Sequence, residues 1–541
     1  MKLNIVPALL AAVLCTSCFE INNELGKDLI ATDQQYDIYT VTLPVEDFIM
    51  SMPNDLTGLS QQWITVGSLR DDDFGLTTRS AAFSLVPVKD TLDFGTDPVF
   101  KAFHFAAPLD TISCLSDGQK YILQNVNVYE LEEAIDYTKE NGTNTPVKHK
   151  AKRITKGIPV YSGSDSLSFD FSEEFGKKYM GILQSDLDSM KHFTAKYPGI
   201  YIDMDTPLGE GGRINLFNIS CFAVNTSGIY YIDTDNAAEL KFSAIYNGVR
   251  KDTSFFFIYG EPEFFDAYEY IENTTRLPQY SYNVTTHESA DRVGPAVENI
   301  LIEGGGGLKP VLSAEGLRNS VLKAISAYGD PDKIIINRAS LRMPFEMPDD
   351  WKALGYYPTV LSPTSRIMSD DGKATFANLT DASNSQENQG DIDRSNLWYA
   401  PDITHHLQEL IRLKKLEKIS NYNIWFLVVS NEQIETATST NAQNEYYQNM
   451  LYSTYYNDLY NGGGYYGGYG YGGYGGYGYN NYSNYYSYML MSSLLNAGST
   501  LTTVQMLDLS RYYHGMLNGP AYADPARRPS VSIVFSVPRE N

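Results

Sequence analysis

Two carboxylates at strand spacing are the first residues of this chain whose pattern could perform chemistry. Asp203 and Asp205 alternate in a run that begins at Ile200, so a strand would present both side chains on one face. Two carboxylates can serve as the acid and base of a glycoside hydrolase, but such pairs normally come from separate strands. The spacing therefore favours a solvated loop or a hydrated calcium contact over catalysis.

The histidines also give no support for catalysis, and neither does a search for familiar catalytic motifs. Only His405 and His406 are adjacent, and helical neighbours point about 100° apart, so they do not readily share one metal. We expect an ordinary surface pair. The sequence contains no HExxH, GxSxG or Walker motif, and Asp71-Asp72-Asp73 lacks the spacing of a calcium hand. We predict a protein that is not an enzyme, with no catalytic residues, no cofactor and no bound metal.

One dense basic run interrupts an otherwise acidic sequence. It consists of Lys148, His149, Lys150, Lys152, Arg153 and Lys156. The simpler interpretation is a solvated loop. The alternative is docking to an acidic partner or to lipopolysaccharide phosphate, through a local field opposite to that of the whole chain.

The first eighteen residues predict export and lipid attachment. Lys2 precedes an apolar run from Ile5 to Leu14, which is too short to span a bilayer but suits a secretory signal. The residues Cys15-Thr-Ser-Cys18 resemble the lipobox of lipoprotein signal peptidase, so Cys18 would become the acylated first residue. The motif usually has Leu where Cys15 stands, and Leu14 lies one position earlier. Simple secretion with cleavage near Ser17 is the alternative.

Length and charge limit the partners. At 541 residues the chain exceeds one ordinary core, and we expect two domains. A net charge of -24 repels nucleic acid, so we predict no nucleic-acid partner. Beyond the leader, no stretch approaches the roughly twenty apolar residues of a membrane helix, so a lipid on Cys18 is the expected membrane contact. Cys114 and Cys221 could form a disulfide or remain free thiols.

Short β-type segments broken by Asp, Asn, Gly and Pro dominate the body, which predicts a mainly β protein of two sandwich or jelly-roll domains with a few short helices. The expected strands are Trp63–Leu69, Ala81–Val88, Val99–Phe105, Ile122–Val128, Ile200–Asp203, Ile214–Val224, Ile229–Ile232, Leu240–Tyr246, Ser254–Tyr259, Asn423–Ser430 and Val531–Val537. The expected helices are Tyr129–Tyr137, Glu173–Leu183, Leu187–Lys196, Ser313–Tyr328 and Thr404 to about Lys415. We expect the last two of those strands to share one sheet.

A further strand is expected near residue 340. Alternation there places Ile335, Asn337, Ala339, Leu341 and Met343 on the inward face. Asn337 would be the one polar member of that buried set, a hydrogen-bonded structural amide.

These patterns divide the chain into five parts: a signal peptide (1–17), a tether (18–55), a first β domain (56–262), a linker (263–308) and a second β domain (309–541). The linker ends in Gly304–Gly307, which we interpret as a flexible joint. The second domain carries a low-complexity Tyr/Gly-rich insertion at about 446–490. Glycine raises the entropic cost of ordering, so we expect a disordered loop, or alternatively a sticky aromatic surface.

Several segments together resemble a known family. They are Gly67-Ser-Leu-Arg-Asp-Asp-Asp-Phe-Gly75, Asn127-Val-Tyr-Glu-Leu131, Ser168-Phe-Asp-Phe with Gly199-Ile-Tyr-Ile, and Ile336-Asn-Arg-Ala-Ser-Leu341. They are similar to Bacteroidota lipoproteins of the domain-of-unknown-function 4270 family, over most of the mature chain. The resemblance implies a β-fold lipoprotein of the outer envelope and supplies no catalytic residues. The Tyr/Gly insertion departs from the family pattern.

The resulting hypothesis is a non-enzymatic, lipid-anchored component of the outer membrane, at its periplasmic or cell-surface face. It would bind a glycan or an outer-membrane protein, or take part in an assembly. The strand at Ile336–Met343 and the helix that follows Asp402-Ile-Thr are also similar to jelly-roll modules of adhesins and carbohydrate-associated proteins, which is an analogy of fold only. Two alternatives remain: a polysaccharide-active enzyme with carboxylates from separate strands, and a purely structural envelope component.

Overall fold

The computed structural model describes residues 35–539 apart from short gaps and two longer ones. The gaps are 61–62, 90, 138–141, 220–221, 225–229, 233, 261–280, 369–373, 380, 382–387 and 438–498. Strands account for 48% of the structure and helices for 17%, in several antiparallel sheets. The expected mainly β fold is therefore confirmed.

The first half of the body is one large sheet that curls around an aromatic core. Its path of paired strands runs β10-β8-β12-β5-β4-β13-β7-β16-β17-β6, with β9 on β8, β11 on β7, β18 on β5 and β3 on β18. Strands β5 and β6 are consecutive in the chain, with only Ser84 between them. The path of paired strands from β5 through β4 and β7 therefore ends at β6, next in the chain to the strand where it began. The strands are β3 (Leu59–Ser60), β4 (Trp63–Asp71), β5 (Gly75–Phe83), β6 (Leu85–Pro87), β7 (Thr96–Ser113), β8 (Gln124–Leu131), β9 (His149–Arg153), β10 (Val160–Tyr161), β11 (Ser166–Asp170), β12 (Ile200–Met204), β13 (Gly211–Asn218), β16 (Ala238–Tyr246), β17 (Val249–Tyr259) and β18 (Ser281–His287).

A short helix covers the core of this sheet. Helix α2 (Glu173–Met180) begins where the Ser172 hydroxyl accepts a hydrogen bond from the Phe175 backbone N–H at 3.3 Å. Phe175 and Tyr179, four residues apart, share its buried face and contact Phe103. Aromatic contacts of this kind give the curled sheet its packed interior. Helices α3 (Gln184–Leu187) and α4 (Met190–Lys196) follow, and β14 (Phe222–Val224) pairs with β15 (Tyr230–Ile232).

The second half contains two sheets that share one core. The first has the order β1-β30-β22-β26-β25, and the second has the order β19-β2-β21-β27-β23-β24 with β28 on β27. Leu341 and Ile533 of the first sheet belong to the same buried cluster as Phe48 and Phe426 of the second. The elements are β1 (Tyr36–Pro44), β2 (Phe48–Ser51), β19 (Gly294–Pro295), β20 (Asn299–Glu303), β21 (Lys309–Leu312), α6 (Ala314–Ile325), β22 (Ile335–Pro344), β23 (Val360–Met368), β24 (Ala374–Asn378), β25 (Ile392–Asp393), β26 (Trp398–Tyr399), α7 (Thr404–Arg412), β27 (Ile424–Ala437), β28 (Ser499–Leu507), β29 (His514–Asn518) and β30 (Ser530–Pro538).

Two segments expected to be connectors contain sheet strands. The tether expected over 18–55 includes β1 and β2, which pair with β30 and β21 of the second half. The linker expected over 263–308 includes β18 in the large sheet and β20, which pairs with β29. Tyr39, Val41 and Leu43 are half-buried and pack on the core at alternate positions, which is the pattern of a strand. The segment is short and follows a polar stretch, so the sequence was interpreted as a tether.

Three local expectations were wrong. Residues 124–131 form β8, so a helix over Tyr129–Tyr137 does not occur, and pairing with β12 decides the conformation. The strands β27 and β30 lie in different sheets. Asn337 is exposed because a bulge between Ile336 and Arg338 reverses the alternation, and its side-chain amide donates to the Ser536 hydroxyl at 2.6 Å.

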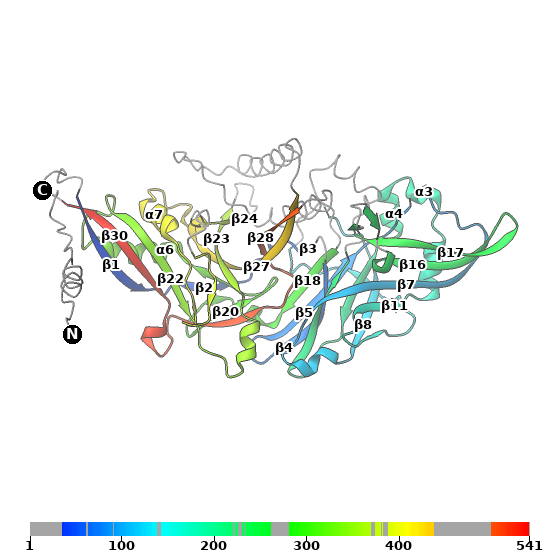
Figure 1. Ribbon diagram of the computed structural model, residues 1–541, viewed down its shortest axis with the longest axis horizontal. Coiled ribbons are helices and arrows are strands. Elements are labelled where there is room, and N and C mark those ends of the chain that lie inside the picture. Colours follow the sequence, from blue (N-terminus) through cyan, green and yellow to red (C-terminus); the bar gives the residue numbers. More distant parts are fainter. Residues whose placement is uncertain are drawn as a thin grey trace, which may run out of the picture.

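The two halves lie along the longest axis of the molecule (Figure 1). Strands β1 and β30 occupy one end, and the β16–β17 hairpin projects at the opposite end (Figure 1). The chain therefore enters and leaves the described structure at the same end. No helix among the described residues is long and apolar enough to cross a bilayer.

Candidate functional site

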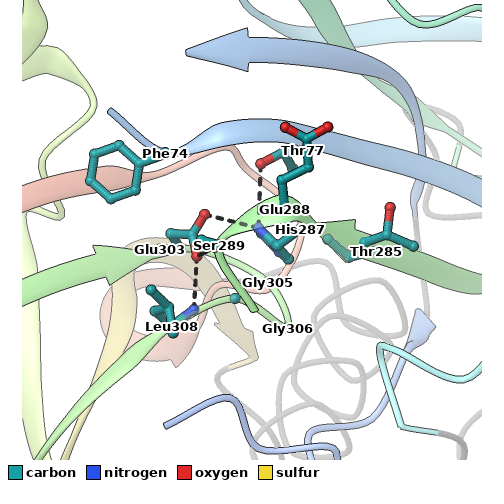
Figure 2. A network of polar contacts seen from close by, with 12 residues as sticks. Phe74, Thr77, Thr285, His287, Glu288, Ser289, Glu303, Gly305, Gly306 and Leu308 are labelled. Carbon is teal, nitrogen blue, oxygen red and sulfur yellow. Dashed lines mark hydrogen bonds and ion pairs between the residues drawn. The ribbon is translucent and has the colours of Figure 1, made fainter. Parts of the chain in front are cut away.

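A buried polar network joins the two halves of the molecule (Figure 2). His287 ends β18 of the large sheet, and Ser289 lies in the 3-10 turn that follows. Glu303 ends β20 of the second half, directly before the four glycines. Its side chain is only 2% exposed, so every charge that it carries must be compensated within the protein.

The Glu303 carboxylate accepts three hydrogen bonds. His287 Nδ1 donates to Oε1 at 3.0 Å, and the Leu308 backbone N–H donates to Oε2 at 3.0 Å (Figure 2). The Ser289 hydroxyl also donates to Oε2. Burial alone would raise the pKa of Glu303, but these three partners lower it to about 2. Burial lowers the pKa of His287, and the charge and the hydrogen bond of Glu303 oppose that effect.

The Lys309 side chain binds the backbone carbonyls of the glycine turn. Its ammonium donates to the carbonyls of Glu303, Gly305 and Gly307 at 2.6, 2.9 and 3.0 Å. Gly305 has φ +56°, and a Cβ there would lie 2.5 Å from the Arg79 guanidinium. The four glycines are buried and hydrogen-bonded, so the flexible joint expected at Gly304–Gly307 is instead a tightly held turn.

Two further contacts cross between the halves beside this turn. Arg79 of β5 donates to the Leu509 carbonyl at 2.8 Å, and Asn144 donates to the Gly306 carbonyl at 3.2 Å. Burial lowers the pKa of Arg79 to about 10. We call the set of Arg79, Asn144, His287, Ser289, Glu303 and Lys309 the clamp.

The clamp holds a serine, a histidine and a carboxylate, yet their order differs from that of an activated nucleophile. Nucleophile activation requires the hydroxyl to contact the imidazole, with the carboxylate behind it. Here Glu303 lies between His287 and Ser289, and the hydroxyl contacts the carboxylate. Ser289 and the side chains of His287 and Glu303 are each 2% exposed. The arrangement is suited to holding the halves together.

A second polar group faces solvent on the outer side of β8, β9 and β12, which we call the β8–β12 face. The His149 ring stacks between Tyr129 and Tyr201, with ring centroids 4.5 Å apart on both sides. Residues of alternate position, among them Val128 and Ile202, are fully buried on the inner side. The strand alternation therefore separates the core from an aromatic and polar surface.

The structure places Asp203 and Asp205 together on this face, as their spacing predicted. The Asn127 side-chain amide donates to both carboxylates at 2.9 Å. Asn125 donates to Asp205 at 2.7 Å, and Arg153 donates to the Asn127 carbonyl oxygen at 2.6 Å. Burial raises the pKa of Asp203, whereas the amides of Asn127 and Asn125 lower that of Asp205. Asp203 is half-buried within β12, so a solvated loop is not what the structure shows there.

The two carboxylates leave the same run of chain toward the same side. The acid and base of a glycosidase must flank the scissile bond from opposite sides. Asp203 and Asp205 instead form part of a surface of amides, carboxylates and aromatic rings. Such a surface can donate and accept hydrogen bonds to a polar ligand laid across it.

The basic run forms strand β9 at the edge of the sheet, not a loop. Lys150 and Lys178 both pair with Glu130, Lys152 pairs with Glu174, and Arg153 contacts Asn127. These cations already have partners within the protein. Lysines along an edge strand prevent a second sheet from adding to it, which accounts for the run without an acidic ligand.

The remaining residues singled out from the sequence are scattered. His406 is buried, donates from Nε2 to the Tyr422 carbonyl at 2.9 Å, and has a pKa lowered to about 4 by burial, so the expected surface pair is wrong for this residue. His405 beside it is exposed. Asp71 accepts from the Asp73 and Phe74 backbones in the turn between β4 and β5. Cys114 is a buried free thiol.

Several expectations concern residues outside the described part of the chain. These are the lipidation site Cys18, the possible disulfide partner Cys221, and the Tyr/Gly-rich insertion. Within the described ranges, no three His, Cys, Asp or Glu side chains lie close enough to hold a metal ion.

Sequence reasoning missed the clamp because its members are far apart along the chain. Arg79, His287 and Glu303 come from three strands, and only the fold brings them together. One signal was present: Glu303 and Lys309 are charged residues that flank the glycines within otherwise apolar runs. A charge in that position needs a buried partner.

Comparisons with known proteins do not extend this description. No family model, no curated protein and no solved structure matches the chain. The fold and the two polar groups define a mainly β protein of two clamped halves with one open polar face. Function therefore has to be argued from the geometry and the sequence alone.

Replacing Glu303 with Gln tests the clamp. The pKa of Glu303 falls from 4.5 to about 2 on folding, which corresponds to about 3 kcal/mol of stability. The unfolded chain binds more protons between these values, so this stability is complete above pH 4.5 and is lost as the pH falls toward 2. Urea unfolding should show Glu303→Gln about 3 kcal/mol less stable than wild type at pH 7, with a difference that shrinks in acid.

The matched control is Glu174→Gln, which removes an exposed carboxylate paired with Lys152. Exposed pairs contribute little, so this variant should unfold like wild type. Equal stability of Glu303→Gln and wild type at pH 7 would contradict the role of the clamp.

Asp203 and Asp205 should respond to neutralisation with opposite signs. The pKa of Asp203 is raised on folding, so its charge destabilises the protein as the pH rises above 3.8 and through the folded value. The pKa of Asp205 is lowered, so its charge stabilises the protein above 3.8. At pH 7, Asp203→Asn should raise the melting temperature and Asp205→Asn should lower it. Melting curves of the two variants that shift in the same direction would refute this assignment.

Proposed function

We propose that this chain is a non-enzymatic lipoprotein of a bacterial outer envelope, anchored through Cys18, that binds a glycan or protein partner through the β8–β12 face. The observation that carries the proposal is the pairing of β1 with β30 along its whole length. This pairing places the start of the described chain in the half of the molecule that is remote from the face (Figure 1).

The position of β1 supports display of the first half away from a membrane. Tyr36 lies opposite Pro538, and Arg539 contacts Asp37 at 2.6 Å, which fixes the start of β1 at the end of the molecule. Residues 18–35 can reach at most about 60 Å when fully extended. A lipid on Cys18 would therefore hold the second half nearest the membrane and leave the first half outermost.

The clamp also supports a role in binding or assembly. A partner bound at the β8–β12 face exerts its force on the first half, whereas the anchor holds the second. Buried charged contacts such as those of Glu303 are costly to break, so the halves transmit force without separating. This favours a binding or assembly component over a hydrolase, because the geometry of Asp203 and Asp205 favours contact with a ligand over cleavage.

Substitution of Cys18 tests the anchor. Cys18→Ser should leave the signal peptide uncleaved by lipoprotein signal peptidase and should abolish labelling by a radioactive fatty acid. The control is Cys15→Leu, which removes the neighbouring cysteine, supplies the residue usual at that position of the lipobox, and should leave lipidation unchanged. Lipid labelling that survives in Cys18→Ser, or that is lost only in Cys15→Leu, would contradict attachment at Cys18.

Binding through the face is tested with the double variant Asn125→Ala and Tyr129→Ala, which removes one amide and one ring of the β8–β12 face. Purified wild-type protein is applied to immobilised surface polysaccharide and to detergent-solubilised outer-membrane protein from the same cells. We expect at least a tenfold loss of affinity for whichever of the two binds. The control Arg342→Ala lies on the outer side of β22 in the second half and should bind as wild type. Equal binding by the face variant would remove this face from the proposal.

A further inference from the structure

Strand β1 is an edge strand of the five-stranded sheet. It pairs with β30 over nine residues, from Tyr36 opposite Pro538 to Pro44 opposite Ser530, without a shift of register. Among the described strands, β30 is its one neighbour, so the opposite edge carries a row of backbone groups that no described strand pairs with. A long, regular edge of this kind is a template for a further strand.

The edge lacks the protection seen elsewhere in the same molecule. Strand β9, which is also an edge, carries Lys150, Lys152 and Arg153 within five residues. Strand β1 carries one charge, Asp37, which Arg539 neutralises at 2.6 and 3.0 Å. It contains no bulge, and Ile38 is 68% exposed on its outer face. The edge at β9 is thus guarded against strand addition, whereas the edge at β1 is not.

We propose that two copies of this chain associate through β1, which pairs antiparallel with β1 of the second copy. The sequence of the strand is suited to pairing with itself. With Thr40 opposite Thr40 of the second copy, Tyr39 lies opposite Val41 and Ile38 opposite Thr42. These are β-branched and aromatic cross-strand pairs, which stabilise a sheet. Asp37 lies opposite Leu43, so like charges do not meet.

Charge also selects this edge for self-association. Each copy carries a net charge of -24, so two copies repel one another over most of their surfaces. The outer residues of neighbouring β30 are Ser532, Val534 and Ser536, which are uncharged, and β1 itself is neutral once Arg539 is counted. Two acidic molecules can approach most closely where such a neutral strip lies at the boundary.

The proposed dimer leaves the rest of the molecule free. Strand β1 lies at the end of the long axis opposite the first half (Figure 1). Pairing there keeps both β8–β12 faces exposed. The proposal does not depend on what the face binds.

The test is sedimentation velocity, in the micromolar range, of residues 19–541, which are the mature chain without its lipid-bearing Cys18. Wild type should sediment as a dimer, and Ile38→Lys should weaken the dimer at least tenfold by placing like charges on the edge. The control Val249→Lys alters an equally accessible apolar side chain, 56% exposed, on the β16–β17 hairpin, and should remain dimeric. A monomeric wild type, or a dimer unaffected by Ile38→Lys, overturns the proposal.

Two further measurements fix the register and exclude a rival occupant. Thr40→Cys should form a disulfide-linked dimer on oxidation, because the residue lies opposite itself, whereas Thr42→Cys should not. Crosslinking at residue 42 alone would overturn this register. A chain that begins at Gln35 is compared with the 19–541 chain. If only the shorter chain dimerises, residues 19–34 occupy the edge and the native dimer is refuted.

Discussion

The ammonium of Lys309, enclosed by three backbone carbonyls, is the contact on which the arrangement of this molecule depends. A buried cation is tolerated only when its donors are satisfied, and the turn at Gly304–Gly307 bends so that its carbonyls converge on that point. The bend brings Glu303 to His287 and Ser289 of the first half, while the absence of a Cβ at Gly305 leaves room for Arg79. The glycines therefore serve close packing between two sheet systems.

Much of the fold could be predicted from the sequence because period-two alternation is local. Strands such as β4, β12 and β30, and the helices α2, α6 and α7, lie close to where their apolar spacing indicated them. Errors arose where a distant partner decides the outcome. β8 continues as a strand beyond Val128 because β12 lies beside it, and β1 is a strand because β30 lies beside it. A bulge at Asn337 shifted one face by a residue, which alternation alone does not reveal.

The candidate site was predicted only in part. The shared face of Asp203 and Asp205 follows from strand spacing, and the structure confirms it. The rings of Tyr129, His149 and Tyr201 come into contact because three strands pair side by side. No residue spacing in the sequence indicates this contact. The basic run shows the reverse case: its charge was evident, but its role at an edge strand becomes clear only when the neighbours of β9 are known.

The pairing of β1 with β30 has a consequence for biogenesis. Strand β1 is the first strand of the body, and its partner β30 ends at residue 538. Nearly the whole chain must therefore be available before β1 and β30 can pair. Closing so long a loop is slow, since contacts distant in sequence have to be found late. The first-half sheet, built from residues 59–287, can meanwhile form within the chain that separates β2 from β20. Maturation would then proceed from the middle outward, with the two termini sealed last.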